Sequence, residues 1–321
     1  MMNKSKDVKK QLIYTTVCML VMMLGIVGLL RSQRNLNEQC VWKFIRYTPS
    51  DYEKHWNDNI ATLQKDVCGE TKKQAAQANE WMSHASLPEL SSRIFSHFQY
   101  QNNCTGQVTT KSIEPLAGLT RSPFYCIYGE GHLVLKDYLV VGSRIGTRAY
   151  LFDIGASLYN SGAGGASQEW FVNTYEAHGI KWDGIYAWEA NVYAPSEVWS
   201  LIPQRLRHIY HYYNIPVNLN PENADKRENP LEYIRKVTQP EDFVLLKIDI
   251  DNNEIEEALV NEILGDERLL ELIDEFYFEH HVNTAPMNRF WGTESSSKTL
   301  VDTYKIFTTM RNKGILAHGW V

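Results

Sequence analysis

The sequence predicts an α/β protein with a Rossmann-like, mainly parallel sheet and helices on both faces. Three observations lead to this fold class. Short apolar runs resemble strands that are buried on both faces, segments of helical pattern separate these runs, and the runs end on acidic residues. Alternation of this kind implies right-handed crossovers between parallel strands. The four apolar runs cover residues 150–153, 184–189, 243–249 and 275–279.

The elements of this sheet follow one another in a regular order. A first strand is expected to end at Asp153, and residues 315–321 close the chain. Proline has no backbone N–H to donate to a neighbouring strand, so Pro216 indicates that the third strand lies at an edge of the sheet. The remaining strands are expected at 184–188, 215–219, 243–248 and 275–278. Helices are expected at 167–178, 195–212, 230–237, 254–273 and 296–311, and the apolar residues of 195–212 recur at helical spacing.

The region before the sheet is predicted to be a stem and accessory region at 31–140, followed by the Rossmann-like domain at 141–321. Residues 31–100 carry polar, helix-like stretches, and Pro88 occupies a first-turn position of one of them. Residues 106–142 are richer in Tyr, Val and turn residues, which predicts short strands or a hairpin. We therefore expect a helical stem and cap that precede the Rossmann-like domain in the sequence.

Residues 12–30 form an apolar run without a charge. At ~1.5 Å per residue the run spans roughly 28 Å, close to the ~30 Å hydrocarbon thickness of a bilayer. A cleaved signal peptide has a shorter apolar core and a small-residue cleavage site, whereas Leu-Leu-Arg-Ser-Gln-Arg follows here. Four lysines precede the span and two arginines follow it, which favours a cytosolic tail at 1–11. We expect a single-pass type II membrane protein with a luminal body.

The cysteines fit an oxidising compartment. One cysteine, Cys18, lies inside the expected span, and four lie beyond it. Four cysteines allow three pairings, and the sequence does not choose among them. Asn103 begins a glycosylation sequon, Asn-Cys-Thr. These features predict a protein of the Golgi or endoplasmic reticulum. The four cysteines beyond the span are Cys40, Cys68, Cys104 and Cys126.

The charge distribution argues against nucleic acid as a partner. The whole chain of 321 residues has a formal net charge of −6. Six of the 32 basic residues but one of the 38 acidic residues lie in 1–34, so the remainder carries a net charge of −11. Phosphate contacts need a basic face, and an acidic body does not provide one. The expected partner is instead a glycan or a small molecule.

Polar residues at the ends of two predicted strands suggest a ligand pocket. Asp153 is followed by a turn with Gly155, Ala156 and Ser157, and a glycine there allows close backbone approach. Glu189 ends the next strand 36 residues later, where a carboxylate can accept the ribose hydroxyls of a nucleoside. The turn is not Gly-x-Gly-x-x-Gly, which counts against a nicotinamide dinucleotide.

The motifs Asp-Ile-Gly-Ala, Trp-Glu-Ala, Leu-Leu-Lys-Ile-Asp-Ile-Asp-Asn-Asn-Glu and Phe-Glu-His-His resemble those of FkbM-type S-adenosylmethionine-dependent methyltransferases. That family reads approximately Asp-x-Gly-Ala-Asn, Glu-Pro, Lys-x-Asp-x-Glu-Gly-x-Glu and Glu-x-His, and the resemblance covers about 150–321. It implies S-adenosylmethionine as cofactor. Asp153 and Gly155 would flank its methionine part, Glu189 would hold its ribose, and Asp249 would face the methyl group. Two departures are the expanded glycine loop and Asp251-Asn in place of Glu-Gly.

Transfer of a methyl group to a hydroxyl requires orientation of the acceptor and removal of its proton. Asp249, His280 and His281 are the candidate bases. Lys247 lies two residues before Asp249, so both side chains face the same side of a strand. Lys247 is accordingly a candidate catalytic residue, and a structural salt bridge between Lys247 and Asp249 is the alternative.

Two other functions compete with methyl transfer. Asp249 and Asp251 form an Asp-x-Asp motif, with which a luminal glycosyltransferase would hold Mn²⁺ or Mg²⁺ against a sugar nucleotide. A domain that keeps the fold without a cofactor is the other alternative. No metal is expected for the methyltransferase itself. A metal site that adds His280 and His281 could use only one of them, because neighbouring strand residues point to opposite faces.

Overall fold

The computed structural model describes residues 40–74, 94–120, 125–126, 139, 147–161, 167–220, 227–291 and 297–320. The chain divides after Val41, and the larger unit, Trp42–Val321, is compact. No helix in the described part of the chain is long and apolar enough to cross a membrane. The predicted cytosolic tail at 1–11 and anchor at 12–30 lie outside the described residues.

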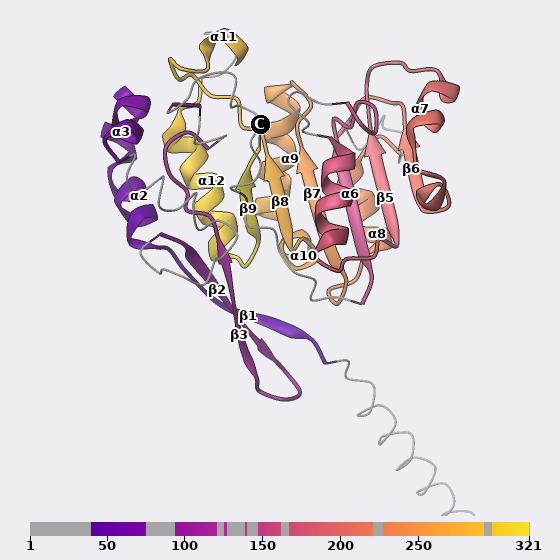
Figure 1. The fold of residues 1–321 in the computed structure, drawn as a ribbon, viewed down its shortest axis with the longest axis horizontal. Coiled ribbons are helices and arrows are strands. Elements are labelled where there is room, and N and C mark those ends of the chain that lie inside the picture. The colour runs from indigo at the N-terminus through magenta and orange to yellow at the C-terminus, as the bar shows by residue number, and fades with distance from the viewer. Residues whose placement is uncertain are drawn as a thin grey trace, which may run out of the picture. The chain divides into compact units, whose positions relative to one another are not determined.

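A six-stranded parallel sheet forms the centre of the larger unit, as Figure 1 shows. Its strand order is β6-β5-β4-β7-β8-β9, so the chain starts in the middle, builds one half, and crosses back to build the other. All five neighbouring pairs are parallel, which confirms the predicted Rossmann-like α/β class. The strands are β4 (Ala149–Ile154), β5 (Gly184–Trp188), β6 (Tyr210–Tyr213), β7 (Phe243–Ile248), β8 (Glu275–Phe278) and β9 (Leu316–Gly319).

Helices cover both faces of the sheet because the central strands are apolar on both sides. Every residue of β4, β7 and β8 is buried. In β4, Leu151 packs with α6 (Gln168–Ala177) and α7 (Pro195–Leu201). Its neighbour Phe152 packs on the other face. The helices of that second face are α8 (Pro230–Val237), α9 (Asn253–Gly265), α10 (Glu267–Leu272) and α12 (Leu300–Asn312).

The N-terminal part of the larger unit contains strands as well as helices. A three-stranded antiparallel sheet has the order β1-β2-β3, and α2 contacts α12 of the main domain. The prediction of a helical stem and cap was therefore wrong for two segments of 31–100, because alternating aromatic and polar residues make them the strands β1 and β2. The elements are β1 (Trp42–Thr48), α2 (Asp51–Leu63), η1 (Gln64–Asp66), α3 (Val67–Lys73), β2 (Ser96–Asn102) and β3 (Val108–Ile113).

All four cysteines outside the predicted span form disulfides. Cys68 pairs with Cys126, with Cα atoms 4.7 Å apart. The bond links α3 to residues that lie 58 positions later in the sequence. Cys40 and Cys104 are also disulfide-bonded.

Two boundaries differ from those predicted from the sequence. The helix expected at 195–212 ends at Leu201 because Pro203 forces Ile202 into an extended conformation. A short 3₁₀ helix, η4 (Gln204–Leu206), follows, and the edge strand β6 precedes the predicted strand at 215–219, which is not a strand. The helix expected at 254–273 is two helices, because Asp266 adopts an extended conformation and caps α10.

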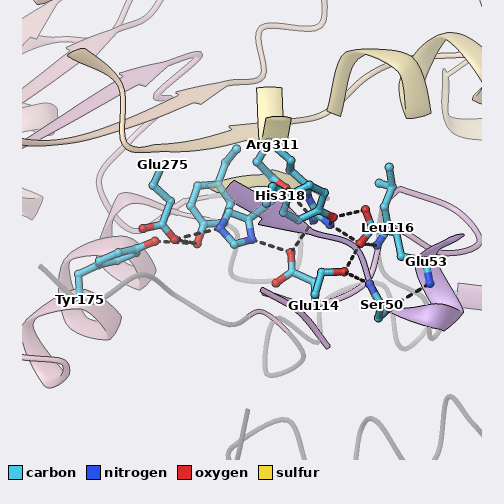
Figure 2. Close-up of polar contacts among 12 residues, drawn as sticks. Ser50, Glu53, Glu114, Leu116, Tyr175, Glu275, Arg311 and His318 are labelled. Atoms are coloured by element: carbon cyan, nitrogen blue, oxygen red, sulfur yellow. Dashed lines mark hydrogen bonds and ion pairs between the residues drawn. The ribbon is translucent and has the colours of Figure 1, made fainter. Parts of the chain in front are cut away.

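Polar side chains form a continuous buried chain between the N-terminal elements and the main sheet (Figure 2). At one end, the Glu53 carboxylate accepts hydrogen bonds from the Ser96 hydroxyl at 2.5 Å and the Leu116 N–H at 3.1 Å. It also accepts from Arg311 Nη1 at 2.8 Å, and neither charged side chain is more than 1 % exposed. The members in order are Ser50, Glu53, Arg311, Glu114, His318, Glu275, Tyr277 and Tyr175.

His318 occupies the middle of this chain, between two carboxylates. Its Nδ1 lies 2.6 Å from Glu114 Oε1, and its Nε2 lies 2.9 Å from Glu275 Oε1. Burial lowers the pKa of His318, but Glu114 and then Glu275 raise it more, to about 9. The imidazole is therefore charged at neutral pH and donates from both nitrogens.

We expect Glu53→Gln to lower the free energy of unfolding by about 3–5 kcal/mol, because it leaves the Arg311 guanidinium buried without its counter-ion. Urea denaturation of the full chain measures this change. The matched control is Glu267→Gln, which breaks an exposed pair with Lys313 of 3.2 Å. The control is expected to cost less than about 1 kcal/mol. Equal losses in the two variants would contradict the importance of the buried pair.

The stability of the chain is expected to fall as the pH rises from about 6.5 to about 9. The unfolded pKa of histidine is ~6.5, so the raised folded pKa of His318 stabilises the native state fully below that pH and not at all above pH 9. The difference corresponds to roughly 3 kcal/mol. Urea denaturation at pH 6 and 9.5 tests it, with His318→Gln as the reference. An identical pH dependence in this variant would contradict the assignment.

Candidate active site

A cavity of about 660 Å³ lies at the carboxyl ends of the central strands. This edge of the sheet, the upper one in Figure 1, includes the point where the strand order reverses, between β4 and β7. Ligands of open α/β sheets bind at such a point. Asp251 and Glu279 are also in the cavity wall. Seven of the nine predicted catalytic and cofactor residues line it, namely Asp153, Gly155, Ala156, Ser157, Glu189, Lys247 and Asp249.

Lys247 is the central cation of this site. Its Nζ lies 3.2 Å from Asp153 Oδ1 and 3.2 Å from Asp249 Oδ2, and it donates to the Gly155 carbonyl at 2.7 Å. The parallel register of β4 and β7 places Lys247 directly opposite Asp153. Lys247 and Asp249 face the same side, as their spacing predicts. All three ammonium protons therefore have an acceptor nearby.

One ammonium group is shared by two carboxylates, of which Asp153 is buried and Asp249 is partly buried. Burial raises the pKa of Asp153, and the attraction of Lys247 offsets this only in part. Burial also raises the pKa of Asp249 well above its usual range, Lys247 lowers it, and neighbouring Glu279 raises it again. Burial lowers the pKa of Lys247, but Asp153 and Asp249 outweigh this effect and raise it. Lys247 thus stays protonated beside two carboxyl groups whose pKa values are raised by burial.

The turn after β4 needs glycine because the backbone at the end of β7 approaches it closely. Gly155 has a φ of +84°, and an added Cβ would lie 1.6 Å from the carbonyl oxygen of Asp249. The N–H groups of Gly155 and Ala156 both donate to the Trp188 carbonyl, at 3.0 and 2.9 Å. The turn therefore joins the ends of β4, β5 and β7.

Glu189 is bound to the loops on either side of it. Its Oε2 accepts from the Ser157 N–H at 2.7 Å, and its Oε1 accepts from the Asn191 N–H at 2.6 Å. Ser157 has a φ of +50°, a conformation that non-glycine residues adopt at a cost, and Tyr212 donates to its carbonyl at 3.0 Å. Each Glu189 oxygen keeps a lone pair free for a further donor.

A second group of polar side chains lies at the end of β8. One ligand atom each from Asp251, Glu279 and His281 falls within 4.8 Å of the others. His281 Nε2 lies 3.3 Å from Glu279 Oε2 and 3.7 Å from Asp251 Oδ1, yet it forms no hydrogen bond. The His281 ring stacks on Trp291, whose indole N–H donates to Glu279 Oε1 at 2.9 Å. Trp291 ends the short helix α11 (Asn288–Trp291).

Glu256 on α9 adds another carboxylate near this group. It is 1 % exposed, its Oε1 accepts from the Ile250 N–H at 2.8 Å, and its Oε2 has no hydrogen-bond partner. Burial raises the pKa of Glu256 to about 7. Burial lowers the pKa of His281, but Glu279 and then Glu256 raise it above its usual value. The site is thus rich in negative charge.

The neighbouring histidine points elsewhere, as expected for adjacent residues that follow a strand. His280 Nδ1 lies 2.9 Å from the Thr303 hydroxyl, and its ring stacks on Phe278. Burial lowers its pKa to about 4, so His280 is neutral and apart from the site. Only His281 of the pair lies with Glu279 and Asp251.

Two charged residues of this region had no role predicted from the sequence. Glu279 was noted only as the end of an apolar run, and its spacing from Asp249 could have suggested a shared site. Glu256 carries no sequence signal, because α9 brings it to the strand ends from another part of the chain, as α11 brings Trp291. Phe290, which is 45 % exposed, also lines the cavity.

Comparison of this chain with protein-family models, curated proteins and solved structures found no match in any of the three.

We expect Gly155→Ala to lower the free energy of unfolding by roughly 3 kcal/mol or more, because its Cβ would overlap the Asp249 carbonyl. Urea denaturation measures the change. Gly179→Ala is the matched control, since Gly179 has a similar φ of +87° but nothing within 4 Å of the added Cβ. It should cost only the ~1–2 kcal/mol of the left-handed conformation. A loss for Gly155→Ala no greater than this would contradict close approach of the two loops.

Proposed function

We propose that this protein is an S-adenosylmethionine-dependent methyltransferase that acts on a hydroxyl of a glycan or small molecule. The observation that supports this most is one cavity, at the switch point of a parallel sheet, that collects Asp153, Glu189 and Asp249 from three strand ends. The resemblance of the same strand ends to FkbM-type motifs agrees with this choice.

The residues of the cavity fit such a cofactor. Its volume of about 660 Å³ lies within the ~300–1,000 Å³ typical of small-molecule sites. Glu189 is 6 % exposed and retains a lone pair on each oxygen, as a residue that accepts from two ribose hydroxyls must. The Gly155–Ser157 turn would border the methionine part.

When bound, the cofactor would supply an electrophilic methyl group on a sulfonium sulfur. The chain's own contribution is to orient a hydroxyl and to accept its proton. Asp249 suits the second task, because burial raises the pKa of this carboxyl and brings its basicity closer to that of a general base. Lys247 stays protonated and is held by two ion pairs and by its hydrogen bond to the Gly155 carbonyl, so we assign it to positioning Asp153 and Asp249.

We further propose that the protein is a type II membrane protein with its catalytic domain in the lumen of the Golgi or endoplasmic reticulum. The disulfide between Cys68 and Cys126 supports an oxidising compartment. The apolar run at 12–30 supports an anchor. The region at 31–140 would then separate the catalytic domain from the membrane.

A metal-dependent glycosyltransferase is the second candidate. The observation that favours it is the position of Asp251, which belongs to the Asp-x-Asp motif and lies beside Glu279 and His281. Asp249, the other member of the motif, is paired with Lys247 at 3.2 Å. The two aspartates of the motif therefore contact different residues. A glycosyltransferase would also leave Asp153 and Glu189 without a role.

Calorimetry of the full chain with S-adenosylhomocysteine, the demethylated product, tests the proposal. We expect saturable binding that Glu189→Gln weakens by about tenfold or more, because a hydrogen bond to a charged group contributes ~1.5–3 kcal/mol. The matched control is Glu197→Gln, an exposed acid of α7 outside the cavity wall, which should bind normally.

Sugar nucleotides with Mn²⁺ provide the opposing measurement. Uridine and guanosine diphosphate sugars should not bind. Metal-dependent binding of either, lost in Asp251→Ala, would replace the methyltransferase by a glycosyltransferase. A folded sample that binds neither class would instead indicate a domain without a cofactor.

A further inference from the structure

Several carboxylates lie close together in the polar group at the end of β8. Asp251, Glu279 and Glu256 surround His281, and Asp249 lies next to Glu279. Lys247, the nearest lysine in the interactions of this site, is already shared between Asp153 and Asp249. Buried carboxylates are costly unless a cation or hydrogen-bond donors compensate them.

An unpartnered imidazole nitrogen provides an independent indication of a ligand. His281 is 7 % exposed, and its Nε2 has no hydrogen-bond partner although it faces two carboxylates at 3.3 and 3.7 Å. Glu256 Oε2, in a side chain that is 1 % exposed, has no partner either. Buried polar atoms are nearly always hydrogen-bonded. These two unpartnered atoms therefore suggest that a ligand or ion binds among the side chains.

We propose that Asp251, Glu279 and His281 bind one divalent cation at the edge of the cavity. Ligands that each lie ~2.0–2.2 Å from a cation are separated from one another by roughly 3–4 Å. The two separations measured from His281 Nε2 fall in this range. Glu256 provides a further carboxylate close to the three ligands.

The donor set indicates which cations fit. Carboxylate oxygens suit Mg²⁺, Ca²⁺ and Mn²⁺, whereas imidazole suits transition metals. Two carboxylates with one imidazole therefore favour a transition metal that accepts both, such as Mn²⁺. Trp291 holds Glu279 by a hydrogen bond and His281 by ring stacking, so these two ligands are fixed before a cation arrives.

The cation would keep coordination positions open toward the cavity. Three protein ligands leave positions for other atoms, and the side chain of Asp251 is 87 % exposed. Asp251 and Glu279 both line the cavity, and so does Asp249. Resting on the proposed methyltransferase, we assign the open positions to the acceptor's oxygens, which favours acceptors with two adjacent oxygens. The cation would lower the pKa of a hydroxyl bound to it, and Asp249, which also lines the cavity, would accept the proton of that hydroxyl.

Titration of the full chain with Mn²⁺ alone, followed by electron paramagnetic resonance of the free ion, tests the site. We expect one Mn²⁺ per chain, bound at least tenfold more weakly by both Asp251→Asn and Glu279→Gln. Because Asp251 is exposed, its variant keeps the fold, and thermal unfolding checks this for both. Glu254→Gln, an exposed acid in the first turn of α9, is the matched control and should bind Mn²⁺ normally. No saturable binding, or equal binding by all variants, would overturn the proposal.

Water proton relaxation then separates an open site from a closed one. Bound Mn²⁺ with open positions exchanges water and enhances the relaxation rate, whereas a structural cation enclosed by protein ligands does not. We expect enhancement, and its absence would overturn the assignment to the acceptor. Binding of S-adenosylhomocysteine is measured separately on the same sample. Cation binding by a sample that does not bind S-adenosylhomocysteine would support the cation site and contradict the proposed methyltransferase function.

Discussion

The ion pairs of Lys247 with Asp153 and Asp249 are the interaction on which the rest of the site depends. One buried ammonium group joins the ends of β4 and β7, where the strand order reverses, and also holds the Gly155 carbonyl. A buried charge without partners costs several kcal/mol, so the arrangement fixes these strand ends relative to each other. The backbone at Gly155 can approach the Asp249 carbonyl this closely only because glycine has no side chain.

This constraint also determines how charge is distributed around the cavity. Burial raises the pKa of Asp249 well above its usual range, Lys247, which also pairs with Asp153, lowers it, and Glu279 raises it again. Negative charge gathers around this part of the cavity. It favours uptake of a proton by Asp249, and it favours a cation beside Glu279, Asp251 and His281. The proposed base and the proposed cation site would therefore share one electrostatic environment.

The sequence predicted the parallel sheet well because buried strands carry a strong local signal. The strands at 184–188, 243–248 and 275–278 agree with those of the structure. The edge strand β6 was missed because Ile209 and Tyr210 continue the helical spacing of the apolar residues before them, although Pro203 ends the helix earlier. Strand ends identified seven residues of the cavity wall, since parallel strands end at one edge. Glu256 and Trp291 could not be found this way, because tertiary packing alone brings α9 and α11 to that edge.

The central claim is that ligands bind among the ends of β4, β5 and β7. Hydrogen–deuterium exchange of the full chain with and without S-adenosylhomocysteine tests it most directly. The structure predicts slower exchange at 153–158, 188–191 and 247–252, because these loops form one connected wall of the cavity. Protection confined to the β2–β3 hairpin at 96–113, or binding that leaves the three loops unchanged, would contradict it.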